Sequence, residues 1–259
     1  MHSINLLYSL LGFCVGFLVG MTGVGGGSIM TPLLILLFGV HPATAVGTDL
    51  LSAAITKAGG TLLHGLYRTI DWRIVGLLAL GSIPMAALTL LVLSRLDISS
   101  EASSSLITKV LSIALFVTAA VLIFRRKLLT LRATHEGYLN ARRTAAATVG
   151  VGAVLGMLVS ISSVGAGAIG VTILVLLYSH LPMRRIVGSD IAHAVPLTLV
   201  AGVGHWILGS IDWRLLGFLL IGSLPGVFLG GHVSVRVPDT ALRLVLAAIL
   251  IIAGSRLIF

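Results

Sequence analysis

Runs of about 20 apolar residues dominate this sequence and restrict the environment in which it can fold. Residues 74–93 and 106–124 form two such runs, and each carries at most one charged side chain. A helix of about 20 residues crosses the roughly 30 Å hydrocarbon core of a bilayer. Only 10% of the 259 residues are charged, against about 25% in soluble domains. The sequence therefore predicts an all-α, polytopic helical membrane protein.

The chain also contains an internal repeat, in which residues from 152 onward match those from 12 onward. The repeated motifs keep the same order in both halves. They pair Val24-Gly25-Gly26-Gly27 with Val164-Gly165-Ala166-Gly167, Pro42 with Pro182, Gly47-Thr48-Asp49 with Gly188-Ser189-Asp190, His64 with His205, Ile70-Asp71-Trp72-Arg73 with Ile211-Asp212-Trp213-Arg214, and Gly81-Ser82-x-Pro84 with Gly222-Ser223-x-Pro225. Such ordered matches indicate duplication of one structural unit.

Each half divides into five apolar segments. They lie at about 5–21, 28–39, 44–66, 73–94 and 105–124, and then at about 145–161, 167–180, 187–208, 214–235 and 240–258. The predicted organisation is a first transmembrane repeat over 1–127, a basic cytoplasmic linker over 128–144 and a second transmembrane repeat over 145–259. An odd number of segments per half predicts two inverted repeats. The first apolar segment is expected to stay in the protein, because residues 1–5 lack the basic region of a secretory signal.

Loop charges support the inverted arrangement. Residues 125–143 carry six Lys or Arg side chains, which the positive-inside rule places in the cytoplasm. Arg68 and Arg73 flank the loop that is then predicted inside, whereas its copy, predicted outside, has only Arg214. Both termini are expected in the periplasm. A parallel repeat with an even number of segments remains the alternative.

Two short segments point to the substrate site. Residues 28–39 and 167–180 are too short to cross a bilayer unaided, and each follows a break rich in glycine or serine. Non-helical backbone at membrane depth survives where it lines a cavity, so matching breaks near the midplane mark a binding site. Helix N-termini there favour an anion. The candidate substrate-binding residues at the breaks are Thr22, Gly25, Gly26, Gly27, Ser28, Ser162, Ser163, Gly165, Ala166 and Gly167.

Other interpretations of the glycines remain open or are excluded. The glycines can instead serve only to let helices pack closely, as small residues do in membranes. A nucleotide-binding loop is a poor alternative, because no strand precedes the glycines and no Lys-Ser/Thr pair follows them.

Ionisable residues within apolar segments are the second set of functional candidates, because such residues are costly in a membrane. Lys57 is a candidate counter-charge for an anionic substrate, and Asp49, Asp190 and His193 are candidates for proton coupling. For the two aspartates, capping of a helix start is the competing interpretation. His64 and His205 lie near the far ends of their predicted helices, where an interfacial or a binding role is possible.

The remaining composition limits partners and cofactors. The net charge of +9 comes from short loops between spans, which fits orientation signals and anionic lipids rather than nucleic acid. A single cysteine, Cys14, forms neither an internal disulfide nor a metal site. The tryptophans Trp72 and Trp213 are expected to anchor loops at the headgroup level. We expect membrane lipids and a small anion as partners and no cofactor or metal, with the oligomeric state, including a homodimer, left open.

The Gly-Val-Gly-Gly-Gly-Ser stretch at 23–28 with Pro32, the Ala-x-Gly-Thr at 45–48 and the duplicated layout resemble the TauE/SafE family of sulfite exporters. The similarity covers essentially the whole chain. It implies movement of sulfur-containing anions, such as sulfite and the organosulfonates of taurine and sulfoacetate metabolism, across the bacterial inner membrane. The second half departs from the pattern, because Thr172 stands where the first half has Pro32.

These observations lead to an expected function. We expect a secondary transporter rather than an enzyme. The transporter is expected to move a sulfur-containing anion such as sulfite or sulfoacetate by alternating access around the two glycine breaks, with or without coupling to protons. An anion channel is the second interpretation. An intramembrane aspartyl-type enzyme built on Asp49 and Asp190 is the third.

Overall fold

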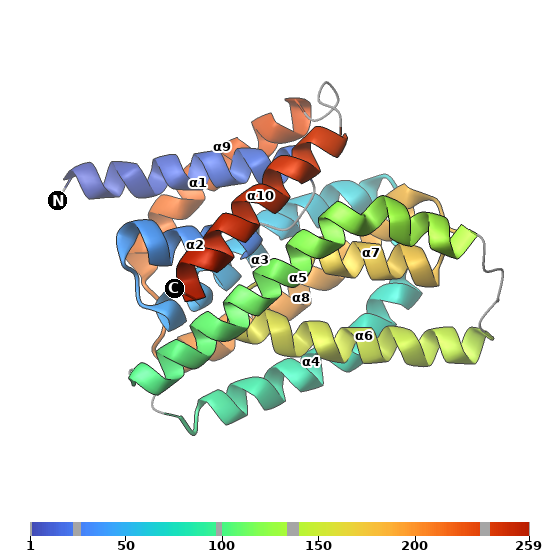
Figure 1. Cartoon of the computed structure of the whole chain (residues 1–259), viewed down its shortest axis with the longest axis horizontal. Helices are drawn as coiled ribbons and strands as arrows, with labels where there is room; N and C mark the ends of the chain where they lie inside the picture. Colours follow the sequence, from blue (N-terminus) through green and yellow to red (C-terminus); the bar gives the residue numbers. More distant parts are fainter. Residues whose placement is uncertain (1, 23–26, 97–99, 134–139, 234–238, 259) are drawn as a thin grey trace.

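The computed structural model describes residues 2–22, 27–96, 100–133, 140–233 and 239–258. Within these ranges the chain forms ten helices and no strand (Figure 1). The helices are α1 His2–Thr22, α2 Gly27–Phe38, α3 Pro42–Leu66, α4 Trp72–Leu93, α5 Glu101–Ala133, α6 Ala141–Ser162, α7 Ala168–Leu177, α8 Met183–Ile207, α9 Trp213–Val233 and α10 Asp239–Ile258. Each predicted apolar segment corresponds to one of them.

The outer surface of the helices is apolar. Leu66, Ile207 and Leu6 are exposed to 80%, 79% and 73%, and they lie on three different helices. Among the described residues, α4, α5, α6, α8 and α9 are long and apolar enough to cross a membrane. Large exposed apolar surfaces are rare on soluble monomers and are satisfied by lipid. The chain is therefore a multi-pass helical membrane protein.

The first helix of each half packs against the fourth helix of the other half. The α1 helix of the first half packs on α9, and the α6 helix of the second half packs on α4 (Figure 1). Glycines make both contacts close. A Cβ atom added to Gly16 would lie 2.5 Å from the carbonyl oxygen of Ser223, and Gly156 approaches Ser82 in the same manner. Small residues at these crossings let the helix backbones approach directly.

The central pair, α3 and α8, runs antiparallel. Gly47 near the start of α3 lies against His205 near the end of α8, and Gly188 near the start of α8 lies against His64 near the end of α3. In this register Lys57 lies close to the middle of the crossing, between Asp49 and Asp190 along the two helices.

Hydrogen bonds also join a loop of each half to a helix of the other half. The backbone N–H of Asp71 donates to Ser189 Oγ at 2.8 Å, and that of Asp212 donates to Thr48 Oγ1 at 3.2 Å. These four positions are equivalent in the repeat, so the duplication is present in the packing as well as in the sequence. The orientation of each half relative to the membrane stays a prediction.

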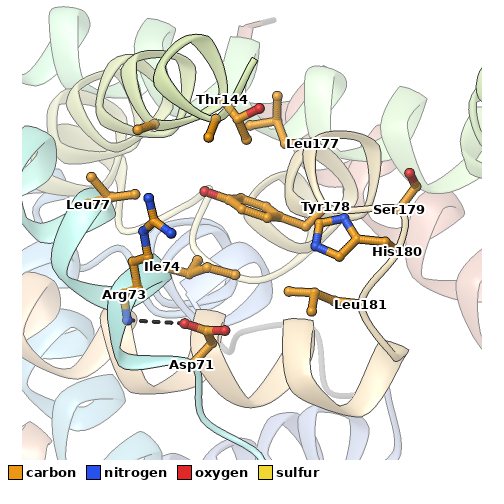
Figure 2. Close-up of a pocket in the computed structure, with 12 residues that line it drawn as sticks. Asp71, Arg73, Ile74, Leu77, Thr144, Leu177, Tyr178, Ser179, His180 and Leu181 are labelled. Atoms are coloured by element: carbon orange, nitrogen blue, oxygen red, sulfur yellow. Dashed lines mark hydrogen bonds between the residues drawn. The ribbon is translucent and has the colours of Figure 1, made fainter. Parts of the chain in front are cut away.

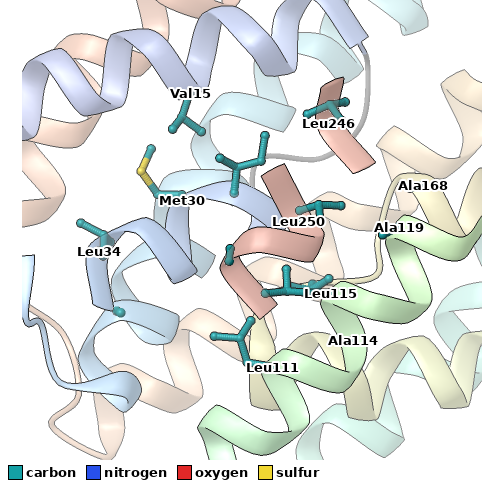
Figure 3. Close-up of a cluster of buried hydrophobic side chains, with 14 of the residues drawn as sticks. Val15, Met30, Leu34, Leu111, Ala114, Leu115, Ala119, Ala168, Leu246 and Leu250 are labelled. Carbon is teal, nitrogen blue, oxygen red and sulfur yellow. The ribbon is translucent and has the colours of Figure 1, made fainter. Parts of the chain in front are cut away.

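An apolar cluster holds the short helices in place. Val15 of α1, Met30 of α2, Leu115 of α5, Ala168 of α7 and Leu250 of α10 belong to one buried group (Figure 3). The cluster therefore joins both short helices, α2 and α7, to long neighbours. This packing supports the breaks that precede the two short helices.

The connection between the halves is more helical than a simple linker. The α5 helix continues to Ala133, and α6 begins at Ala141. The basic residues Arg125 and Lys127 accordingly belong to the last turns of α5, and Arg142 and Arg143 to the first turn of α6.

Candidate functional site

The break in the second half lies between α6 and α7. Its five residues, 163–167, are non-helical and buried. Ser163, Gly165 and Gly167 have φ angles of 59°, 125° and 126°, in the region that glycine adopts without the steric cost that other residues meet. Among the described residues, no side chain caps the first N–H groups of α7. The predicted break before the second short helix is therefore confirmed.

The break in the first half is described only at its edges. The α1 helix ends at Thr22 and α2 begins at Gly27, whereas the candidate residues Gly25 and Gly26 lie outside the described residues. Ser28 is buried at the start of α2. Thr22 Oγ1 donates to the carbonyl oxygen of Leu18 at 2.8 Å, so the Thr22 hydroxyl proton is engaged within α1.

Asp49 joins the two short-helix regions. Its Oδ2 accepts a hydrogen bond of 2.6 Å from Thr31 of α2 and one of 2.9 Å from Ser163 of the break. The carboxyl group is buried, with 2% of Asp49 exposed. Buried carboxylates are retained in proteins when hydrogen bonds or charges compensate them. Asp49 therefore ties α3 to both α2 and the α6–α7 break.

The capping interpretation of the two aspartates is wrong. The α3 helix begins at Pro42 and α8 at Met183, so Asp49 and Asp190 each lie about two turns inside their helices. Free helix N–H groups occur only in the first turn. Neither carboxylate can therefore cap its own helix.

Asp190 is in a different environment from Asp49. It is 1% exposed, and among the described residues its Oδ1 has no hydrogen-bond partner. The same oxygen lies directly against the Cα of Gly170 in α7. In the repeat, Val171 occupies the place of Thr31, so one of the two hydroxyls that serve Asp49 is missing here. Asp190 therefore remains an under-compensated buried carboxyl group.

Lys57 lies at the break in the second half. Its Nζ donates to the carbonyl oxygen of Ala166 at 3.5 Å, and its charge interacts with both Asp190 and Asp49. The structure thus brings together Lys57, Asp49, Ser163 and Ala166, all of which the sequence analysis had singled out. They form one polar group around the start of α7.

His193 is buried one turn after Asp190 and faces α4. Its Nε2 shares a hydrogen bond of 2.8 Å with Ser82 Oγ, and among the described residues its Nδ1 has no partner. Sequence reasoning did not select Ser82 as a site residue. The repeated Gly-Ser-x-Pro motif that contains it was the available signal. Thr31, the partner of Asp49, was missed as well.

Three further predicted residues have structural partners. Ser162 Oγ donates to the carbonyl oxygen of Leu158 at 2.7 Å and accepts from Val164 N at 3.3 Å, which shapes the break. His205 is fully buried within the protein, and its Nε2 bonds the carbonyl oxygen of Ser160 at 2.9 Å, whereas its depth in the membrane stays a prediction. His64 Nδ1 bonds Thr69 Oγ1 at 2.8 Å.

A small cavity adjoins Asp49. Its volume is about 20 Å³, enough for roughly one water molecule. Asp49, Ser52 and Thr56, one helical stripe of α3, line it together with Ser223 of α9. Ser223 Oγ is buried and has no hydrogen-bond partner among the described residues. The cavity is therefore large enough to hold about one water molecule beside the carboxyl group of Asp49.

Comparison with known proteins identifies the family. Residues 8–257 match the family described as sulfite exporter TauE/SafE. The chain belongs to this family. A relative from Bacillus subtilis strain 168, named probable membrane transporter protein YjnA, is 38% identical over 250 residues, which cover 96% of this chain and 98% of the relative.

More distant relatives carry similar names. Probable membrane transporter protein YdhB of Bacillus subtilis strain 168 is 27% identical, over 98% of this chain and 100% of the relative. Probable membrane transporter protein MJ0441 of Methanocaldococcus jannaschii is 23% identical, over 96% and 93%. No solved structure matches the chain. Membership of the TauE/SafE family makes this protein a member of a membrane transporter family.

Proposed function

We propose that the protein is a secondary transporter that moves a small sulfur-containing anion, such as sulfite or sulfoacetate, across the bacterial inner membrane by alternating access. The observation that carries this proposal is the contact of Lys57 with the carbonyl group of Ala166. It places a cation beside a non-helical, buried segment between two helices. Family membership supports the sulfur anion as substrate.

The start of α7 suits a bound oxyanion. Gly165 and Gly167 have no side chains to hinder approach, and no side chain in the described part of the chain caps the N-terminal amides. Such amides, together with the positive end of the helix dipole, stabilise negative charge. Lys57 supplies the full positive charge that a buried anion requires, because neutral donors alone compensate a charge incompletely.

Proton coupling is assigned to the carboxyl groups near Lys57. Asp49 and Asp190 both interact with the Lys57 charge, so an arriving anion competes with them for it. Protonation of one carboxyl group would release Lys57 for the substrate. Asp190 is the stronger candidate, because its Oδ1 has no hydrogen bond among the described residues, whereas Asp49 has two hydroxyl donors. His193 lies next along the same face of α8.

The decisive experiment compares Lys57→Met with Lys109→Met. Lys109 is the matched control, because it lies in the apolar helix α5 but is exposed. Purified, monodisperse protein is titrated with sulfite, sulfate, thiosulfate, taurine and sulfoacetate. We expect Lys57→Met to weaken binding of the preferred anion by at least tenfold and Lys109→Met to leave it unchanged. Lys57→Arg should bind with intermediate affinity, since the planar guanidinium places its charge differently.

Flux measurements test the transport mechanism itself. A carrier that alternates between two states saturates at modest turnover, whereas a channel does not. Proteoliposomes loaded with the preferred anion should therefore show saturable flux. Equal affinity of the parent and Lys57→Met for every anion tested would remove Lys57 from the site, and flux that rises linearly with concentration would favour a channel.

A further inference from the structure

A cleft with a volume of about 320 Å³ lies between α4, α6 and the segment that follows α7 (Figure 2). This volume is in the range of small-molecule sites, roughly 300–1,000 Å³. The cleft is far from Lys57. It borders Ala145 near the start of α6, whereas Lys57 contacts the break beyond the end of that helix. The intervening 18 residues of α6 span about 27 Å.

The cleft lies between the N-terminal ends of α4 and α6, because these two helices pack closely only further along their lengths. Gly81 of α4 lies directly against the carbonyl group of Val149 in α6. One helical turn earlier, Leu77 and Ala145 line the cleft instead. The small side chains of Ala141 and Ala145 leave the space open. The closely packed crossing therefore forms the inner end of the cleft.

Arg73 supplies a cation to this cleft. Figure 2 shows its guanidinium group pointing into the space toward Tyr178. Among the described residues, no carboxylate or carbonyl oxygen pairs with that guanidinium group. The nearby Asp71 is otherwise engaged, because its Oδ1 accepts from the backbone N–H of Arg73 at 3.1 Å and its Oδ2 lies 3.7 Å from Arg185 Nε.

Neutral donors complete the lining. The Tyr178 hydroxyl group lies 2.8 Å from Thr148 Oγ1, and it points toward Arg73 (Figure 2). His180 and Ser179 line the part of the cleft that lies away from Arg73 (Figure 2). A guanidinium group with hydroxyl and imidazole groups around it matches the planar, multidentate recognition of oxyanions.

The surroundings of the cleft are strongly positive. Arg68, Arg184 and Arg185 line a neighbouring groove, which meets the cleft where Leu181 is followed by Pro182. Together with Arg73, these side chains make four arginines among the residues that line the cleft and the groove, where Asp71 supplies one carboxylate. A concave surface with one sign of charge raises the local concentration of the opposite ion. Free anions are therefore drawn to this face of the protein.

We propose that the cleft is a second anion site, which binds a small free oxyanion through Arg73 before the anion reaches Lys57. The identification of the ligand as a sulfonate or sulfite rests on the proposed function, whereas the site itself rests on the cleft and its charges. In the predicted topology this site faces the cytoplasm. It would then load substrate from that side of the membrane.

The repeat offers a matched control for the test. Arg214 is the equivalent of Arg73 in the second Ile-Asp-Trp-Arg motif, but it lines neither the cleft nor the neighbouring groove. Arg73→Gln and Arg214→Gln are titrated with sulfoacetate in nanodiscs of neutral phosphatidylcholine. We expect two binding steps in the parent and in Arg214→Gln, and at least a tenfold loss of affinity in one step for Arg73→Gln. Ala145→Leu, which fills the cleft, should remove the same step.

Two further arms separate the competing outcomes. Lys57→Met should remove the other binding step. If Lys57→Met removes that step but Arg73→Gln binds sulfoacetate as the parent does, the second site is overturned and the proposed function stands. If Arg73→Gln instead removes the only binding step and Lys57→Met has no effect, the cleft is supported and the proposed role of Lys57 fails. In nanodiscs containing phosphatidylglycerol, an effect of Arg73→Gln on retention of that lipid, without any effect on sulfoacetate, would reassign the cleft to a lipid headgroup and overturn the proposal.

Discussion

Replacing Gly81 by Ala should destabilise the protein, whereas the same change at Gly76 on the same helix should not. A Cβ atom on Gly81 would press on the carbonyl group of Val149 and lie 2.7 Å from the backbone nitrogen of Ala153. Heavy atoms in contact prefer separations of about 3.5–4.0 Å. Accommodation of the methyl group therefore requires α4 and α6 to separate by about 1 Å. At Gly76 nothing lies within 4 Å of the added Cβ.

The comparison isolates the packing cost. Both changes gain roughly 0.5–1 kcal/mol from the higher helix propensity of alanine. Only Gly81→Ala adds an overpacking cost of about 1–3 kcal/mol. The two variants should therefore differ by about 1–3 kcal/mol in the free energy of unfolding, with Gly76→Ala at least as stable as the parent.

Thermal unfolding of both variants in one detergent measures the difference. For a chain of this size, each kcal/mol corresponds to about 2–4 °C in Tm. The repeat supplies an independent copy of the experiment, because Gly222 presses on α1 and Gly217 has nothing within 4 Å. Gly222→Ala should be less stable than Gly217→Ala by a similar amount. Equal Tm values within either pair would refute the close helix contacts.

Further predictions concern topology and transport. Cysteines placed at Ser3 and Thr134 should be labelled from opposite sides of the membrane, and labelling of both from one side would exclude the inverted repeat. Gly165→Leu should abolish transport, because the φ of 125° disfavours a side chain, whereas Gly150→Leu, whose Cβ position is open, should retain it. Gly26→Leu should abolish transport as well, and normal transport by folded protein with either break variant would reduce these glycines to packing residues.

The apolar helices were predictable from sequence because hydrophobic length alone selects them. A run such as residues 74–93 has no stable alternative to a membrane helix. The break before α7 was predictable because glycine and serine interrupt an otherwise apolar segment there, at a place that the duplicated sequence repeats. Helix starts were harder to locate. The prolines Pro42 and Pro182 mark the starts of α3 and α8, and proline is typical of a first helical turn. This signal would have placed Asp49 and Asp190 inside their helices.

The partners of the buried polar groups were not predictable, because they come from other helices. Asp49 and Ser163 are 114 residues apart, and Ser82 and His193 are 111 apart. The distance along the chain gives no information on such pairs before the helix packing is known. Lys57 could be selected as a functional residue because a cation in the middle of a span is costly. Its contact with Ala166, 109 residues further along the chain, depended on how α3 packs against the break between α6 and α7.

The unequal environments of Asp49 and Asp190 lead to a final prediction, which separates structural from coupling roles. Asp49→Asn should lower stability by about 1–3 kcal/mol, because Oδ2 accepts from both Thr31 and Ser163 and loses its charge in the amide.

Asp190→Asn should lower stability less than Asp49→Asn does, because among the described residues Oδ1 has no hydrogen bond to lose and only the interaction with the Lys57 charge is removed. If Asp190 carries the coupled proton, the Asp190→Asn protein should still exchange anions between the two sides but should no longer accumulate them in response to a pH gradient. Tm in detergent and anion uptake with and without that gradient distinguish the two variants. Gradient-driven accumulation by folded Asp190→Asn would exclude Asp190 as the proton carrier, and an unchanged Tm for Asp49→Asn would show that its two hydroxyl contacts do not hold α2 and the break in place.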